Sequence, residues 1–222
     1  MNLCLFDLDH TLLPLDSDHA WGDFMISLGW VDASEFKARN DAFYEDYLRG
    51  ELDIHAYVAY STGPIQVRSA AERAAAHAAF MREIIEPAIR PEARELVERH
   101  RREGDLIALV TATNEFVTAP IAQAFGIDHL IAVSLERGPG DTISGRIAGV
   151  PSYQAGKVTR CADWLSQLGR EWRDFHRVSV YSDSTNDLPL LERATDAVAT
   201  NPSPALERIA TERGWRILRL FA

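Results

Sequence analysis

Short apolar runs alternate with helical patterns along most of this chain. The first run, residues 3–6, is apolar at every position and too short for a helix, which is typical of a strand buried on both faces of a parallel sheet. After Pro91 the same alternation continues, and the further expected strands are 106–110, 130–133, 178–181, 197–199 and 216–220. The pattern predicts an α/β fold with a doubly wound parallel sheet, and a hairpin excursion within 135–149.

A long segment between the first two of these strands has helical patterning and no convincing strand. We expect four helices there, near 17–28, 33–49, 53–61 and 67–85. The turn signals between them are Leu28-Gly29, Gly50 and Gly63-Pro64. The chain is therefore predicted to consist of an α/β core, residues 1–14 and 89–222, with an inserted helical domain of residues 15–88.

Aromatic residues recur at helix-like spacings within the inserted segment. We interpret most of them as the core of the helical bundle, with one or two left to line a substrate pocket. They are Trp21, Phe24, Phe43, Tyr44, Tyr47, Tyr57 and Tyr60.

The chain has 33 acidic and 23 basic residues, which gives a formal net charge of -10. This balance offers no basic surface for a phosphate backbone, so neither nucleic acid nor an anionic membrane is expected as a partner. No apolar run approaches the length of a membrane span, and the first residues lack the pattern of a secretion signal, so we expect a cytoplasmic protein. Cys4 and Cys161 are predicted to be buried thiols rather than a disulfide.

The first expected strand ends abruptly in two carboxylates, Asp7 and Asp9. Because they follow a parallel strand and are one residue apart, both can face the crevice where ligands bind, and their charges call for a cation. Other polar residues follow later expected strands or begin a helix, namely Thr111, Lys157, Asp183 and Asp187. Taken alone, the acidic cluster of residues 183–187 would be interpreted as a helix N-cap. Thr111 alone would be a loop residue, and Lys157 alone a solvated surface residue. Their joint arrangement around Asp7 favours a catalytic site.

Phosphoryl transfer to an aspartate requires this combination of residue types. A dianionic phosphate approaches several carboxylates only with a hard cation, and Mg²⁺ prefers one or two carboxylates plus phosphate and water oxygens. Asp7, Asp183 and the backbone carbonyl of Asp9 can fill that role. Four carboxylates and one lysine sum to about -3, which Mg²⁺ reduces to about -1. The cluster therefore predicts a Mg²⁺-dependent reaction.

The remaining groups have matching tasks in such a transfer. Lys157 can shield the nucleophile and a phosphate oxygen, while the Thr111 hydroxyl and the Ala112 backbone N–H can donate to another phosphate oxygen. Acidic neighbours are expected to raise the pKa of Asp9. Asp9 is therefore our candidate for protonating the leaving alcohol and then deprotonating the attacking water.

With these residues the chain resembles the haloacid dehalogenase superfamily of phosphohydrolases along essentially its whole length. The first motif of that family matches residues 7–11, the second Thr111, the third Lys157 and the fourth 183–187. The resemblance implies Asp7 as the nucleophile that forms an aspartyl-phosphate and Asp9 as the general acid and base. It implies Asp7, the Asp9 carbonyl and Asp183 as Mg²⁺ ligands. In the family pattern Asn186 and Asp187 support the metal and the lysine.

The helical insertion resembles the small four-helix cap of the phosphoserine phosphatase-like branch, which closes over the site and selects the substrate. In that branch an acidic residue after the first motif holds the substrate amine, and Asp16 lies at the matching position. A helix N-cap role for Asp16 stays open beside it. The branch also uses a cap arginine for the serine carboxylate, and that position counts to Ala59 here. This departure argues against phosphoserine and leaves an amine-bearing phosphate such as histidinol phosphate as a hypothesis.

The sequence thus predicts a Mg²⁺-dependent phosphatase that acts on a small phosphorylated metabolite. A phosphotransferase or phosphomutase would use the same aspartyl-phosphate but pass the phosphoryl group to an alcohol. A non-catalytic metal- or phosphate-binding protein would keep the residues without turnover. A signalling receiver domain is disfavoured because it has no helical insertion. His10, within the first motif, is interpreted as a spectator.

Overall fold

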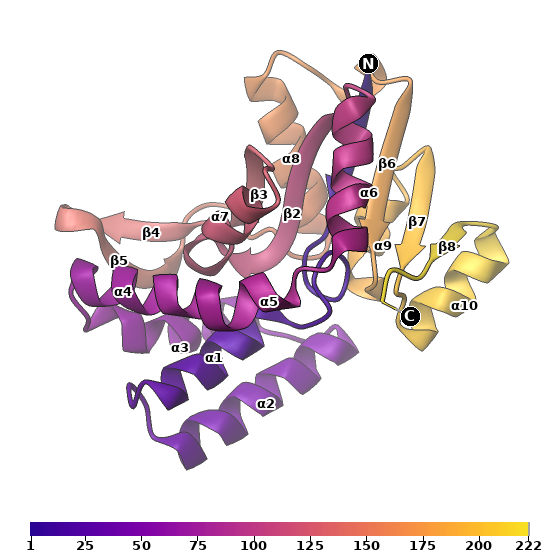
Figure 1. Cartoon of the computed structure of the whole chain (residues 1–222). Helices are drawn as coiled ribbons and strands as arrows, with labels where there is room; N and C mark the ends of the chain where they lie inside the picture. The colour runs from indigo at the N-terminus through magenta and orange to yellow at the C-terminus, as the bar shows by residue number, and fades with distance from the viewer. Residues whose placement is uncertain (222) are drawn as a thin grey trace.

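The computed structural model describes residues 1–221, apart from the side chain of Asp141, and its centre is a six-stranded parallel sheet (Figure 1). The strand order is β3-β2-β1-β6-β7-β8. The strands are β1 (Asn2–Phe6), β2 (Leu106–Asn114), β3 (His129–Val133), β6 (Arg177–Ser182), β7 (Asp196–Thr200) and β8 (Arg216–Leu218). β1 pairs with β2 on one side and β6 on the other, and Phe6 lies level with both Leu109 and Tyr181. The carboxyl ends of the three central strands therefore meet at one edge of the sheet.

Both faces of the sheet are covered, as the uninterrupted apolar runs predict. Along β1, Cys4 and Phe6 belong to one buried apolar cluster and Leu3 and Leu5 to the other. The flanking helices are α6 (Pro91–Arg102), α7 (Glu115–Ala124), α8 (Ala155–Gln167), α9 (Leu188–Leu191) and α10 (Pro204–Arg213). Short 3₁₀ turns are η2 (Pro139–Asp141), η3 (Trp172–Asp174) and η4 (Thr185–Asp187). The prediction of a doubly wound α/β fold is confirmed.

The inserted helices lie together below the carboxyl ends of the strands in Figure 1. They are α1 (Ser17–Ser27), α2 (Ala33–Arg49), α3 (Ile54–Gln66) and α4 (Ala70–Phe80), and the chain then returns through the π-helical turn η1 (Met81–Ile85) and α5 (Glu86–Ala88). Each of the four begins after an Asp or Ser whose side chain accepts a backbone N–H, as N-caps do. The inserted four-helix cap is thus present, and the domain limits 1–14, 15–88 and 89–222 remain our proposal.

Two details of the sequence prediction are wrong. Gly63-Pro64 is not a turn, because α3 continues through it to Gln66, and the next helix begins only at Ala70. α3 packs against the hairpin of β4 (Leu135–Gly138) and β5 (Thr142–Ile147), and this tertiary contact outweighs the local turn signal. Gly145, with φ +78°, lets that hairpin approach Gln66 closely. The second strand is also longer than expected, so Thr111 lies within β2 rather than after it.

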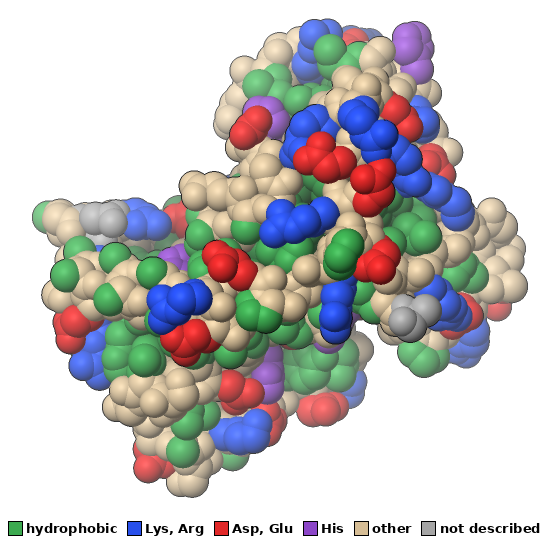
Figure 2. All heavy atoms as spheres, viewed as in Figure 1, with side chains coloured by type: hydrophobic (Ala, Val, Ile, Leu, Met, Phe, Trp, Pro, Cys, Tyr) green, Lys and Arg blue, Asp and Glu red, His purple; other side chains and the backbone are tan. Residues whose placement is uncertain are grey.

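Other sequence expectations agree with the structure. Cys4 and Cys161 are buried free thiols. At the end of α6, Arg101 pairs with Glu98 and Arg102 with Glu95, which fits the absence of a basic surface. Figure 2 shows acidic and basic side chains interspersed on this face. Within residues 1–221, no helix has both the length and the apolar character needed to cross a membrane.

Candidate active site

A buried lysine joins two of the predicted site carboxylates. Lys157, in the first turn of α8, is 1% exposed, and its Nζ donates to Asp7 Oδ1 and to Asp187 Oδ2, both at 2.8 Å. The Ser182 hydroxyl also donates to Asp187 Oδ2, at 2.7 Å. Burial opposes the charged lysine, but the adjacent Asp187 and Asp7 carboxylates raise the pKa of Lys157 above its ordinary value. A fixed positive charge therefore lies beside Asp7.

Asp7 and Asp183 meet at a single hydroxyl group. Thr11 Oγ1 donates to Asp7 Oδ2 at 3.3 Å and to Asp183 Oδ1 at 3.2 Å. Burial raises the pKa of Asp7 to about 7 despite Lys157, and burial with the Asp7 and Asp187 charges raises that of Asp183 well above its ordinary value. Two carboxylates converging in a buried acidic site form the hard oxygen donor set that suits Mg²⁺. The residues present fit the predicted metal.

The Asp9 side chain points toward the beginning of the cap. Its Oδ1 accepts the Ser17 backbone N–H at 2.7 Å, and its Oδ2 accepts the Thr113 hydroxyl at 2.9 Å. Burial, with the charge of Asp16, raises the pKa of Asp9 to about 6. The carboxyl group is therefore held between core and cap, with a raised proton affinity, as general acid catalysis requires. Sequence reasoning missed Thr113, whose hydroxyl becomes significant only through this contact.

The predicted phosphate-binding residues lie at the irregular end of β2. Thr111 is buried, and its Oγ1 accepts the Thr113 backbone N–H at 3.1 Å, which leaves its own proton available to a ligand. Thr111 and Ala112 both line the main pocket. Asn186, expected to support the metal and the lysine, instead directs its Nδ2 to the Tyr47 carbonyl of the cap at 2.9 Å. Asp187 alone of that pair contacts Lys157 among the described residues.

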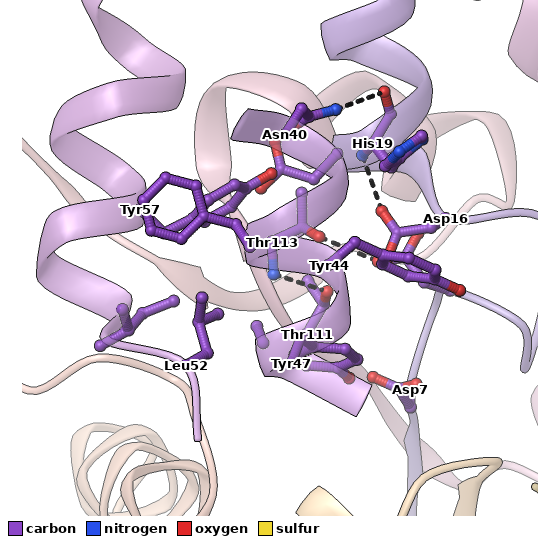
Figure 3. Close-up of a pocket in the computed structure, with 15 residues that line it drawn as sticks. Asp7, Asp16, His19, Asn40, Tyr44, Tyr47, Leu52, Tyr57, Thr111 and Thr113 are labelled. Atoms are coloured by element: carbon purple, nitrogen blue, oxygen red, sulfur yellow. Dashed lines mark hydrogen bonds between the residues drawn. The ribbon is translucent and has the colours of Figure 1, made fainter. Parts of the chain in front are cut away.

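The pocket lies between the strand ends and the cap (Figure 3). Four of the seven cap aromatics line it, so interpreting most of them as bundle core is wrong for Phe43, Tyr44, Tyr47 and Tyr57. The other three are core or packing residues: Trp21 and Phe24 are buried beside Phe80, and Tyr60 stacks on Phe36. The cap therefore presents an aromatic wall, formed by these four pocket residues, to the candidate catalytic carboxylates.

Asp16 has the N-cap role that the sequence left open, and its contact with a substrate amine stays a prediction. It is the N-cap of α1, its Oδ1 accepts the His19 N–H at 2.8 Å, and it also lines the pocket. Ala59, by contrast, is exposed on α3, whose residues facing the pocket are Ile54 and Tyr57. Equating Ala59 with the cap arginine position is therefore wrong. The described pocket lining nevertheless contains no lysine or arginine.

A second group of possible metal ligands, His100, Glu103 and Asp105, lies at the opposite end of β2. Asp105 already accepts hydrogen bonds from Asn2, Arg177 and, at 2.7 Å, the His100 ring. This cluster is a structural ion network, well separated along the strands from the candidate catalytic carboxylates.

Comparisons with known proteins agree with this geometry. Residues 4–192 match the haloacid dehalogenase-like hydrolase family. A histidinol-phosphatase of Neisseria meningitidis serogroup C (strain 8013) is 43% identical over 217 residues, 98% of each chain. Phosphoserine phosphatase SerB1 of Mycobacterium tuberculosis is 35% identical over 153 residues, 69% of this chain and 48% of its own length.

Solved structures show the same fold. A Bordetella pertussis Tohama I protein of unknown function has a TM-score of 0.94 at 49% identity, with 99% of each chain covered. A substrate-bound phosphoserine phosphatase shares the fold, with a TM-score of 0.68 at 15% identity over 98% of this chain and 92% of its own. The chain belongs to the haloacid dehalogenase-like hydrolases, and among them to the phosphatases.

Proposed function

We propose that this protein is a Mg²⁺-dependent phosphomonoesterase that works through an aspartyl-phosphate on Asp7. The observation that carries the proposal is the contact of Asp7 with the buried, charged Lys157 at the edge of a pocket that also contains Asp9 and Thr111. Asp7, Asp183 and the Asp9 carbonyl would hold the metal. When bound, Mg²⁺ would supply the positive charge that lets a phosphate dianion approach these carboxylates.

The side chains of this protein then divide the reaction between them. An Asp7 carboxylate oxygen attacks phosphorus, Lys157 neutralises charge on Asp7 and on a phosphate oxygen, and the Thr111 hydroxyl and Ala112 N–H donate to another phosphate oxygen. Asp9 gives its proton to the departing alcohol oxygen. It then removes a proton from the water that attacks the phosphoaspartate, which releases phosphate and restores Asp7.

We further propose histidinol phosphate as the substrate. Asp16 and the neighbouring carboxylates favour a positively charged leaving group, and the aromatic wall suits a flat ring. The lining has no lysine or arginine to receive the carboxylate of phosphoserine. The name of the 43% identical Neisseria protein supports the same choice. A small phosphorylated metabolite of this kind is expected in the cytoplasm.

Steady-state phosphate release from histidinol phosphate, phosphoserine and p-nitrophenyl phosphate tests the proposal. With Mg²⁺ we expect release that EDTA abolishes and added Mg²⁺ restores. We expect kcat/KM for histidinol phosphate to exceed that for phosphoserine at least about tenfold, because the acidic lining repels a carboxylate. An enzyme that releases phosphate from no ester would contradict the proposal. Transfer to an added alcohol without hydrolysis would favour the phosphotransferase alternative.

A further inference from the structure

A second pocket carboxylate, Asp18, has no assigned task. It lines the pocket but is only 7% exposed, and within residues 1–221 it forms no ion pair with a lysine, arginine or histidine side chain. Asn114 Nδ2 lies 3.5 Å from its Oδ1, and the Tyr57 side chain hydrogen-bonds to it. Burial, with the charges of Asp16 and Asp9, raises the pKa of Asp18 well above its ordinary value. A buried carboxylate in this setting lacks a strong partner.

Asp16 and Asp18 are not equivalent, although both belong to the start of α1. The Asp16 carboxylate accepts the His19 N–H at 2.8 Å as the helix N-cap, so the backbone already binds one of its oxygens. Asp18 lies within the first turn and caps nothing. The basic residue nearest in sequence, His19, is engaged elsewhere, since its Nε2 lies 2.8 Å from Asp41 Oδ1. The described side chains thus give Asp18 neutral hydrogen-bond partners but no charged one, and a ligand in the pocket can supply a further donor.

The walls around Asp18 restrict the shape of that ligand. Tyr57 and Leu52 lie across the pocket from Asp7 in Figure 3, and the rings of Tyr57 and Phe43 are 5.3 Å apart, edge to face. Flat apolar walls beside a buried acceptor suit a planar ring that carries a donor. An aliphatic chain without a donor group would leave this acceptor unpaired and would not stack on the rings.

We propose that Asp18 is a specificity-determining residue that accepts a hydrogen bond from a ring nitrogen at the far end of the leaving alcohol. The substrate class is then a phosphate monoester of an amino alcohol that carries a nitrogen heteroaromatic ring. Its phosphate would lie at Asp7, its amine would bind Asp16, and its ring N–H would donate to Asp18. This inference rests on the proposed function, because it supposes that the pocket binds the leaving group of a phosphate ester.

The variant Asp18→Asn tests the assignment, with Asp23→Asn on the exposed side of the same helix as the matched control. Asp18→Asn keeps an acceptor oxygen but removes its charge, so we expect kcat/KM for histidinol phosphate to fall roughly 3- to 10-fold, mainly through KM, the difference between a hydrogen bond to a charged group and one to a neutral group. Turnover of p-nitrophenyl phosphate, which has no ring N–H, should change less than about twofold, and Asp23→Asn should match the wild type with both esters. An equal loss with both esters would assign Asp18 a structural role and overturn the proposal.

A measurement on the wild-type enzyme tests the same assignment without relying on the Asp18 variant being folded. Histidinol and phenylalaninol are compared as inhibitors of p-nitrophenyl phosphate hydrolysis, because both carry the amine and only histidinol carries ring nitrogens. We expect histidinol to bind at least about tenfold more tightly. Equal inhibition would overturn the role of Asp18 while leaving the hydrolase intact. A wild-type protein that hydrolyses none of the esters would overturn the proposed function and this inference together.

Discussion

The Asp9 carboxyl group, the proposed general acid, is held in place by hydrogen bonds from two neighbouring residues. One of its oxygens is held by the Ser17 N–H and the other by the Thr113 hydroxyl, 104 positions away in sequence. A carboxyl group fixed on both sides cannot turn away from the leaving oxygen. Thr113 is thus a positioning residue for the proposed general acid.

Replacing Thr113 by Val removes the hydroxyl while keeping the side-chain shape. We expect kcat for histidinol phosphate to fall roughly 3- to 10-fold, the effect of one neutral hydrogen bond. The loss should be smaller for p-nitrophenyl phosphate, whose leaving group needs little protonation, and Thr113→Ser should recover activity. Equal losses with both esters, or no recovery in the Ser variant, would argue against positioning of Asp9.

The sequence identifies the residues whose chemistry is set by type and order, and misses those whose role arises from folding. Asp7 carries a charge directly after a buried apolar strand, and Lys157 carries one at the start of a helix. The order of these charged residues along the chain therefore reveals both. Thr113 and Asp18 have ordinary side chains in ordinary positions. Thr113 belongs to the site only because folding brings its hydroxyl to Asp9. Asp18 belongs to it only because folding brings its carboxylate to Asn114 and Tyr57.

At the scale of elements, the end of α2 is fastened to the catalytic core. Asn186 Nδ2 donates to the Tyr47 carbonyl, and Gln154 Nε2 donates to the Gly50 carbonyl at 3.0 Å. The His10 ring and the Tyr44 hydroxyl are 3.2 Å apart, so the residue interpreted as a spectator also contacts the cap. These bonds hold α2, and with it the aromatic wall, over the site.

Removing the Gln154 amide should loosen this closure. For Gln154→Ala we expect KM for histidinol phosphate to rise roughly 2- to 10-fold, the equivalent of one hydrogen bond between cap and core. Gln167→Ala, an exposed position at the end of helix α8, which Gln154 directly precedes, is the control and should leave KM unchanged. The melting temperature of both variants is measured to check that they are folded. An unchanged KM in folded Gln154→Ala would show that this contact does not hold the cap closed.

The elements themselves are predictable where one signal dominates. Helix α2 has an Asp N-cap and a glycine after its end, and its limits agree with the expected 33–49. Local signals fail where tertiary contacts compete, as when α3 runs through Gly63-Pro64 against the hairpin. The aromatic wall was missed for the same reason, because helical spacing does not distinguish a face that packs from one that lines a pocket.

Across the whole molecule, the doubly wound topology brings distant residues to one edge of the sheet. Asp7 and Lys157 are 150 positions apart and Thr11 and Asp183 are 172 apart, yet each pair is in hydrogen-bond contact. The first strand lies centrally, so the first motif meets both the second and the fourth. The cap then adds carboxylates and aromatic rings to a site in which we propose that the core residues carry out the phosphate chemistry.

Trapping the phosphoenzyme tests the central claim most directly. The enzyme is mixed with Mg²⁺ and ³²P-labelled histidinol phosphate, quenched in acid within milliseconds, and digested for peptide mapping. We predict label on the peptide that contains Asp7, stable in acid and released by hydroxylamine as an acyl phosphate is, and none in Asp7→Asn. Label retained by Asp7→Asn, or phosphate release at full rate without any labelled enzyme, would contradict the account.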